Sequence, residues 1–208
     1  MFFSILIAAL TAYLLGNLNG SVCVSAIVAD DDVRKHGSGN AGLTNFIRNY
    51  GVGKAIYVIL IDAGKAVVAC VAAGLLLEPY GFYLEGKVLG GFAVMLGHVC
   101  PALLGFKGGK GILSGLFIAL AVDWRIAVLI LAVFAVIYLS TQYVSLGSIL
   151  AAIAFGIGFA VLYHDNLLVM LGGIAMACMT IFMHRGNIVR LVKGQERKTN
   201  LFGKGKQA

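Results

Sequence analysis

Three segments of the sequence combine glycine, small polar residues and basic residues, and each could bind an anion. The first segment runs from Asp30 to Gly51, and its centre reads Ser38-Gly39-Asn40-Ala41-Gly42-Leu43-Thr44-Asn45, followed by Arg48. Glycines beside hydroxyl and amide groups let backbone N–H groups face one point, and a helix beginning near Thr44 would add its positive end. This pattern favours an anion, although a flexible loop whose Ser and Asn cap a helix explains the segment equally well.

The second segment begins with His98-Val99-Cys100-Pro101 and continues as Gly105-Phe106-Lys107-Gly108-Gly109-Lys110-Gly111. Two lysines among four glycines supply positive charge and allow close backbone approach, which suits phosphate oxygens. The segment is not a Walker A loop, because Leu104 replaces the first glycine and Gly111 stands where Ser or Thr would hold magnesium. A basic turn at a membrane surface would explain the lysines but not the glycines. We therefore favour a phosphate site here.

The third segment runs from His184 to Glu196 and is strongly basic. Taken alone, it is typical of a helix that lies on anionic lipid. His184 and Asn187 are three residues apart, however, so on a helix they would share one face directed back toward the rest of the molecule. Glu196 is the only acidic residue of the segment, and an ion pair with Arg or Lys is its simplest role.

Other reactive side chains lie outside these segments. Asp62 and Lys65, three apart in an apolar stretch, predict a structural ion pair, with a role near the site as the second interpretation. His36 and the pair His164-Asp165 are expected to be solvated. Four cysteines without a CxxC pair predict neither a disulfide framework nor a metal site.

The rest of the chain is far too apolar for a water-soluble core. Of its 208 residues, 60% are hydrophobic and 12% charged, and the mean hydropathy is +0.95. Since a membrane helix needs about 20 apolar residues, we predict an all-α integral membrane protein, a single domain (residues 1–208) with about seven transmembrane helices. The predicted helices are 2–28, 54–77, 87–105, 111–122, 126–141, 143–163 and 166–183. Residues 199–208 are expected to form a disordered basic tail.

The basic residues predict the orientation, because cytoplasmic loops carry an excess of Lys and Arg. With seven spans, thirteen of the sixteen fall on one side: Arg34, Lys35, Arg48, Lys54, Lys107, Lys110, Arg185, Arg190, Lys193, Arg197, Lys198, Lys204 and Lys206. The other side receives only Lys87 and Arg125. The N-terminus is therefore expected outside, with the tail and all three polar segments in the cytoplasm. The net charge of +7 is explained by the membrane, so no nucleic acid partner is predicted.

In order and spacing, the three segments resemble the motifs of the PlsY family of bacterial membrane glycerol-3-phosphate acyltransferases. The matching residues are Ser38-Gly39-Asn40-x-Gly42-x-Thr44-Asn45-x-x-Arg48, Gly97-His98-x-x-Pro101 with Phe106-Lys107-Gly108-Gly109-Lys110-Gly111, and His184-x-x-Asn187-Ile188-x-Arg190-Leu191-x-x-Gly194-x-Glu196. Weaker matches are Asp62-x-x-Lys65 and Tyr143-Val144-Ser145-Leu146-x-Ser148-Ile149. The resemblance implies transfer of an acyl group from acyl phosphate to the 1-hydroxyl of glycerol 3-phosphate, giving lysophosphatidate and phosphate without a thioester donor. It places the enzyme in the bacterial inner membrane, in contact with lipid, and we expect a monomer without cofactor or metal.

Site residues follow from the motifs and the resemblance together. The expected catalytic set is Ser38, Asn40, Arg48, His98, Lys107, His184 and Asn187. The expected phosphate-binding set is Gly39, Thr44, Asn45, Gly108, Gly109, Lys110, Gly111 and Ser145. Asp62, Lys65 and Glu196 are expected to be structural.

No histidine is followed five positions later by aspartate, the spacing with which many acyltransferases deprotonate the acceptor hydroxyl. Because acyl phosphate is already activated, positioning and charge stabilisation could supply most of the rate, with the donor's phosphate accepting the proton. The main alternative is a transporter or receptor for an organic phosphate. Short, nearly uncharged outside loops and the lack of an inverted repeat argue against it.

Overall fold

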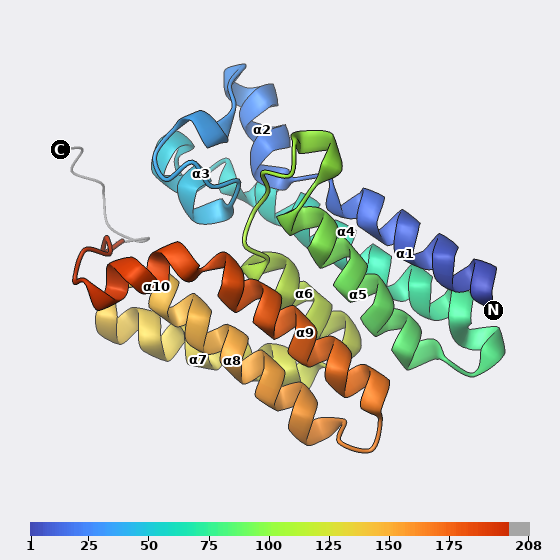
Figure 1. Cartoon of the computed structure of the whole chain (residues 1–208). Coiled ribbons are helices and arrows are strands. Elements are labelled where there is room, and N and C mark those ends of the chain that lie inside the picture. The colour runs from blue at the N-terminus through green and yellow to red at the C-terminus, as the bar shows by residue number, and fades with distance from the viewer. Residues whose placement is uncertain (200–208) are drawn as a thin grey trace.

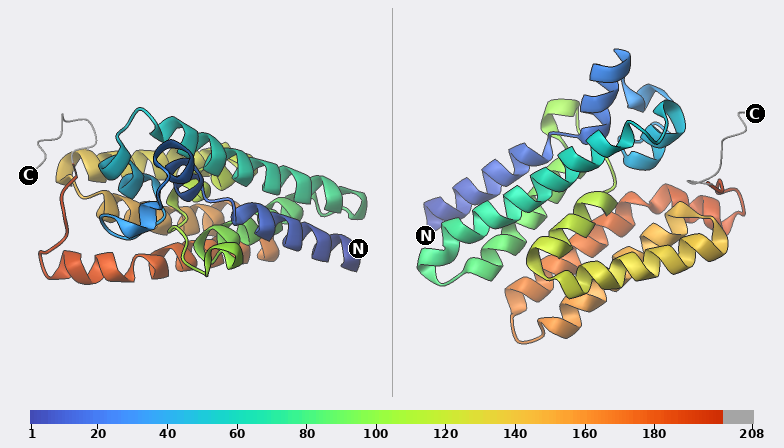
Figure 2. Two further views of the ribbon diagram at one scale, coloured as in Figure 1. Left: turned by 90° about the horizontal axis from the view of Figure 1, so that it is seen from above. Right: turned by 180° about the vertical axis from the view of Figure 1, so that it is seen from behind.

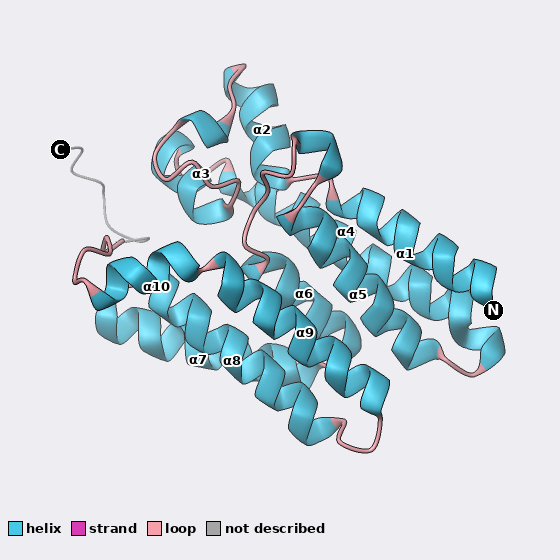
Figure 3. Ribbon diagram, in the orientation of Figure 1, coloured by secondary structure: helices cyan, strands magenta, loops and turns pink. Residues whose placement is uncertain are grey.

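The computed structural model describes residues 1–199, and that part of the chain consists of helices and their connections (Figure 3). The α-helices are α1 (Phe2–Gly16), α2 (Gly20–Ala29), α3 (Leu43–Tyr50), α4 (Ala55–Leu77), α5 (Tyr83–Val99), α6 (Ile112–Val122), α7 (Trp124–Thr141), α8 (Val144–Leu162), α9 (Leu167–Met183) and α10 (Arg185–Val192). Short 3-10 turns cover Val33–Lys35, Glu78–Tyr80 and Ala102–Leu104. The predicted disordered tail, apart from Thr199, lies outside the described residues.

The long helices form two packed groups (Figures 1 and 2). Helices α1, α4 and α5 pack against one another, α8 packs between α7 and α9, and the two groups meet through α6 and through contact of α5 with α9. The N-terminus and the connection between α4 and α5 lie at one end of the bundle (Figures 1 and 2). Residues 30–54 and α10 lie at the other end, so segments far apart in sequence meet there.

Glycine allows close approach between α1 and α5. A Cβ atom on Gly97 would lie 2.1 Å from the carbonyl oxygen of Tyr13, and one on Gly16 would lie 2.3 Å from that of Val94. Small residues at such a crossing are typical of helices that associate in lipid, where packing rather than hydrophobic burial drives the contact.

The predicted helix 2–28 is broken, which was not expected. α1 ends at Gly16 and α2 begins at Gly20, and Asn19 caps α2 because its side-chain oxygen accepts the N–H of Val22 at 3.1 Å. The two asparagines of this turn, Asn17 and Asn19, are buried. Asn19 satisfies a backbone N–H at the start of α2 that has no helical partner, whereas Asn17 donates to the carbonyl oxygen of Tyr13 at 2.7 Å and accepts the N–H of Leu103 at 3.0 Å.

The remaining boundaries agree with the prediction to within a few residues, except in α5. That helix starts four residues before the predicted 87 and ends six before the predicted 105, because the chain turns at Cys100 and Pro101. Two short helices, α3 and α10, cover parts of the first and third polar segments.

The structure supports an integral membrane protein. Five helical stretches are long and apolar enough to cross a membrane, namely 2–29, 55–80, 83–104, 124–141 and 144–162, and α9 with α10, bent by 56°, would make a sixth. The eleven residues of α6 rise only about 16 Å, roughly half of a hydrocarbon core. Large apolar side chains point outward, as lipid contact requires; Phe3, Val136 and Leu168 are exposed. The predicted count of seven spans is therefore not reached by helix length alone.

Candidate active site

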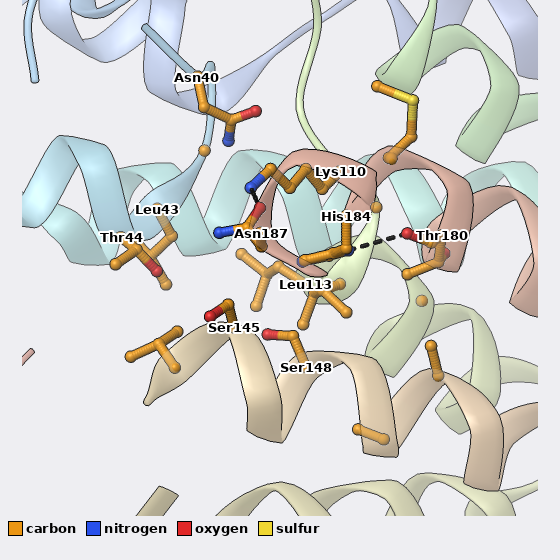
Figure 4. Close-up of a pocket in the computed structure, with 18 of the residues that line it drawn as sticks. Asn40, Leu43, Thr44, Lys110, Leu113, Ser145, Ser148, Thr180, His184 and Asn187 are labelled. Atoms are coloured by element: carbon orange, nitrogen blue, oxygen red, sulfur yellow. Dashed lines mark hydrogen bonds between the residues drawn. The ribbon is translucent and has the colours of Figure 1, made fainter. Parts of the chain in front are cut away.

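A cavity of about 830 Å³ lies where α3, α6, α8, α9 and α10 meet (Figure 4). All three polar segments contribute to its wall. The predicted residues that line it are Ser38, Gly39, Asn40, Thr44, Asn45, Arg48, Asp62, His98, Lys110, Gly111, Ser145, His184, Asn187 and Glu196. The structure therefore brings together side chains from positions 38 to 196.

Lys107 does not belong to this wall, although the sequence placed it in the catalytic set. Its side chain is exposed, and its carbonyl oxygen accepts a hydrogen bond from Arg34 at 3.2 Å. Lys110, three residues later, is the lysine of the second segment that faces the cavity. The turn between them points one ammonium group outward and the other inward.

Gly108 and Gly109 also do not line the cavity, and they act by letting the loop pack on His98. A Cβ atom on Gly108 would lie 2.0 Å from the carbonyl oxygen of His98, and one on Gly109 would lie 2.2 Å from its Nε2. The N–H of Gly109 donates to that same carbonyl at 3.0 Å. The two glycines therefore let the loop lie against α5, which places Lys110 at the cavity. Any side chain at these positions would push the loop away from α5.

Asn45 fixes the shape of the first loop. Its amide nitrogen lies 3.0 to 3.1 Å from the carbonyl oxygens of Val33, His36 and Asn40, and its oxygen accepts the N–H of Ser38 at 3.1 Å. These bonds fold residues 33–40 over the start of α3. The positive end of α3 then points toward the cavity, together with the neighbouring side chains of Asn40 and Thr44 (Figure 4).

A chain of hydrogen bonds joins the second and third segments to α8. Lys110 donates to the side-chain oxygen of Asn187, and Asn187 donates to Glu196 at 2.7 Å. Ser145 donates to the same carboxylate at 2.7 Å, and Arg190 forms an ion pair with it, also at 2.7 Å. The buried Asn187 is thus oriented from both sides.

Burial and neighbouring groups shift the pKa values of Lys110 and Glu196. Burial, followed by the nearby Arg190, lowers the pKa of Lys110 to about 8. Burial alone would raise the pKa of Glu196, but hydrogen bonds from Ser145, Asn187 and Arg190 outweigh it and lower that pKa. At neutral pH the wall therefore carries a protonated Lys110 held beside an ionised Glu196.

His184 presents one ring nitrogen to the cavity side. Its Nδ1 lies 2.8 Å from the carbonyl oxygen of Thr180, and because a carbonyl only accepts, Nδ1 carries the proton (Figure 4). In the neutral ring, Nε2 is then left with a lone pair. His184 is 3% exposed, so this nitrogen can meet a substrate away from bulk water.

Arg48 has a partner that the sequence did not suggest. Its guanidinium donates a hydrogen bond to the hydroxyl of Thr199. The backbone of Thr199 is held in turn: its carbonyl oxygen accepts the hydroxyl of Tyr138 at 3.0 Å, and its N–H donates to the carbonyl oxygen of Gln142 at 3.0 Å. Thr199, the first residue of the predicted tail, is therefore buried and bonded to α3 and α7. Burial and, next, the nearby Arg197 lower the pKa of Arg48.

The deeper part of the cavity is apolar, and sequence reasoning did not identify it. Its wall includes Leu113, Leu116, Ile130, Phe134, Ala151, Ala152, Phe155 and Met176. One signal was available: Ser145, Ser148, Ala152 and Phe155 recur at three or four residues on α8, with small residues leaving room beside the helix. The cavity thus joins a cationic end to an apolar interior, which suits a molecule with a phosphate head and an aliphatic chain.

No three His, Cys, Asp or Glu side chains within residues 1–199 gather in a group that could hold a metal ion. Among the described residues, the cations that line the cavity are instead Arg48, Lys110, Arg185, Arg190 and Arg197. Several cations around one cavity can hold two phosphate groups at once.

Comparison with known proteins agrees with this arrangement. The model of the glycerol-3-phosphate acyltransferase family matches residues 6–194. Glycerol-3-phosphate acyltransferases of Finegoldia magna and Clostridioides difficile are 35% and 38% identical to the chain over 93% and 94% of its length, and over 96% of their own. The crystal structure of PlsY, an integral membrane glycerol 3-phosphate acyltransferase, in its glycerol 3-phosphate form has a TM-score of 0.83 at 31% identity, over 95% of this chain and 96% of that one.

The second crystal form of PlsY, with lysophosphatidic acid, has a TM-score of 0.79 over the same share of both chains. Fold, cavity and relatives together define a multi-pass membrane enzyme that acts on a phosphate-bearing precursor of phospholipids. The chain belongs to the PlsY-type glycerol-3-phosphate acyltransferase family, which confirms the resemblance carried by its three motifs.

Proposed function

We propose that this enzyme transfers a fatty acyl group from acyl phosphate to the 1-hydroxyl of glycerol 3-phosphate, giving lysophosphatidate and inorganic phosphate. The observation that carries the proposal is a single cavity with basic side chains at one end and an apolar interior at the other. Crystal forms of the similar PlsY enzyme with glycerol 3-phosphate and with lysophosphatidic acid support the same pair of ligands. The two phosphates lie at the basic end, and the acyl chain extends along α8.

The roles of the polar residues follow from their places in the wall. Arg48 and Lys110 bind the phosphates, together with the backbone N–H groups of the loop around Ser38 and Asn40. His184 and Asn187 orient the acceptor, because both are buried and fixed by Thr180 and Glu196. His98 orients the second loop, because its backbone carbonyl oxygen accepts the N–H of Gly109.

The chemical step needs no external oxidant, cofactor or metal. The acceptor oxygen forms the ester bond to the acyl carbon as the bond from that carbon to the phosphate oxygen breaks, and the acceptor proton leaves on the released phosphate. Lys110 and Arg48 stabilise the charge that develops on the departing phosphate. If the pH-rate profile of His98→Ala or His184→Ala lacked one ionisation that the wild-type profile shows, that histidine would be a general base, and the proton would not pass directly to the phosphate.

We further infer seven crossings, with the N-terminus outside and the site at the cytoplasmic end. Helix α6 is short, but the loop before it reaches back to His98 of α5, so this loop and α6 together complete a crossing. The excess of Lys and Arg at the end that carries α3 and α10 supports this orientation. Single cysteines that replace Lys54 or Lys193 should then react with an impermeant reagent added on the cytoplasmic side. Single cysteines that replace Glu78 or Asp165 should react with the reagent added outside. Labelling of both sets from one face would contradict the topology.

The direct test uses purified protein in detergent or lipidic mesophase with acyl phosphate and glycerol 3-phosphate, and follows released phosphate and lysophosphatidate together. Acyl-CoA serves as the negative donor, and equal rates with acyl-CoA would overturn the donor assignment. If no phosphate is released but labelled glycerol 3-phosphate crosses reconstituted vesicles, the chain is a transporter.

A further inference from the structure

Asp62 and Lys65, buried on α4, contact the break between α1 and α2. The Lys65 ammonium donates to the carbonyl oxygens of Gly16 at 3.2 Å and Leu18 at 2.6 Å, which end α1 and the turn after it. The Asp62 carboxylate accepts the N–H of Gly20, the first residue of α2, at 3.1 Å. The two side chains form an ion pair at 2.8 Å, each about 2% exposed.

The charges match the helix ends that they contact. The carbonyl end of α1 carries partial negative charge and meets the ammonium, whereas the N–H end of α2 carries partial positive charge and meets the carboxylate. Backbone groups exposed at a break inside the apolar layer would otherwise lack partners, which is costly in lipid. The ion pair therefore completes the broken first span. This alone would be a structural role.

A third contact leads from the pair to the site. The Lys65 ammonium lies 2.9 Å from Nδ1 of His98. An ammonium group can only donate hydrogen bonds, so Nδ1 must be the acceptor. The neutral His98 ring then carries its proton on Nε2. That Nε2 lies next to Gly109, and His98 lines the cavity. His98 is thus held as a donor toward the loop that delivers Lys110, the opposite tautomer to that of His184.

The same break is tied to the first loop. Asn19, within the break, donates its side-chain N–H to the carbonyl oxygen of Ala41 at 3.0 Å. A Cβ atom on Gly109 would lie 2.8 Å from that oxygen, so Ala41 also touches the second loop. The break, the buried pair and both glycine-rich loops are therefore one connected unit.

We propose that Asp62 and Lys65 are positioning residues for glycerol 3-phosphate binding: they hold His98 as an Nε2–H donor and set the two glycine-rich loops around the phosphate. The proposal rests on the proposed function for its substrate. It differs from a purely structural ion pair in one respect, because removal of the charges should weaken substrate binding even in a protein that folds normally.

The main test is the double variant Asp62→Asn with Lys65→Gln, which removes both charges and leaves hydrogen-bonding amides. Loss of one partner would strand a buried charge, whereas joint replacement is often tolerated. We expect unchanged expression and thermal midpoint, and a rise of at least about tenfold in the Kd and KM for glycerol 3-phosphate. The matched control is Asp123→Asn with Arg125→Gln, an ion pair of 2.7 Å that does not line the cavity, and its kinetics should stay at the wild-type level.

Binding of glycerol 3-phosphate is measured by calorimetry without any donor, so the result does not depend on acyl phosphate. Failure of the wild-type enzyme to use acyl phosphate would contradict the proposed donor and leave this binding comparison intact. A folded double variant with wild-type Kd and KM would overturn the positioning role.

A second pair of variants decides the matter if the double variant does not fold. In His98→Gln the side-chain amide can donate from near the position of Nε2, whereas in His98→Asn it reaches only the position of Nδ1. We expect His98→Gln to retain tighter glycerol 3-phosphate binding than His98→Asn by about tenfold. Equal or weaker binding by His98→Gln would overturn the assigned tautomer and the proposal with it.

Discussion

The ammonium of Lys110 donates a hydrogen bond to the side-chain oxygen of Asn187, 77 positions further along the chain. This contact joins the glycine-rich loop before α6 to the start of α10. Asn187 in turn donates a hydrogen bond to the Glu196 carboxylate, which also accepts a hydrogen bond from Ser145 of α8. One lysine is therefore oriented by three elements before any substrate binds, which is the preorganisation that electrostatic catalysis requires.

The two lysines of the second segment should differ strongly in importance. Lys110→Met removes a cation from the cavity wall, and we expect kcat/KM to fall by about a hundredfold or more. Lys107→Met is the matched control, with the same chemical change three residues away on an exposed side chain, and should change kcat/KM by less than about threefold. Phosphate release under identical conditions checks both. The reverse ranking would show that the loop adopts another path in the active enzyme.

The pKa of Lys110, near 8, predicts a pH dependence of substrate binding. The protonated lysine binds the anion, so kcat/KM for glycerol 3-phosphate should be maximal below that pKa and fall as the pH rises through it. The phosphate ester itself loses its second proton near pH 6, so it stays doubly charged over the fall. Lys110→Arg should move the fall to higher pH, because a guanidinium keeps its charge. A wild-type profile that stays flat to about pH 10 would contradict the assignment.

Glu196 should matter for both stability and rate. Its side chain, 9% exposed, accepts hydrogen bonds from Ser145 and Asn187 and pairs with Arg190. In Glu196→Gln the ion pair is lost, and we expect about 1 to 2 kcal/mol less stability and about tenfold lower kcat. Thermal unfolding and phosphate release measure the two effects. The exposed Glu78→Gln, at the other end of the bundle, is the control and should match the wild type.

How far the sequence predicted this molecule depends on the kind of information that each feature needs. Spans such as α4 and α8 were predicted because lipid requires continuous apolar stretches, and that requirement is local. The break at Asn17 and Asn19 was missed, since two amides within an apolar run do not by themselves end a helix. It is specified by Asp62 and Lys65, more than 40 positions away.

The site shows the same division. The motifs identified the three segments, and most of the predicted residues line one cavity. Lys107 and Lys110 could not be separated, because both follow glycine-rich sequence and only the packing of Gly108 and Gly109 on His98 decides which one faces inward. The apolar interior was missed for another reason: in a membrane protein, residues that line a cavity and residues that face lipid have similar composition, so the spacing of small residues along α8 does not by itself indicate a cavity.

The length of acyl chain that the enzyme accepts should be set by the side chains that line the apolar interior along α8. Ala152, 4% exposed, and Phe155, 4% exposed, both line the cavity about two turns or more beyond Ser145. Ala152→Leu narrows this space, so the ratio of kcat/KM for long against short acyl phosphates should fall by about tenfold, whereas Phe155→Ala should raise it. Ile157→Phe, which enlarges a side chain on the exposed face of α8, is the control and should leave the ratio unchanged. If neither Ala152→Leu nor Phe155→Ala changes the ratio, the acyl chain does not occupy this part of the cavity, and it must lie along the lipid-facing surface instead.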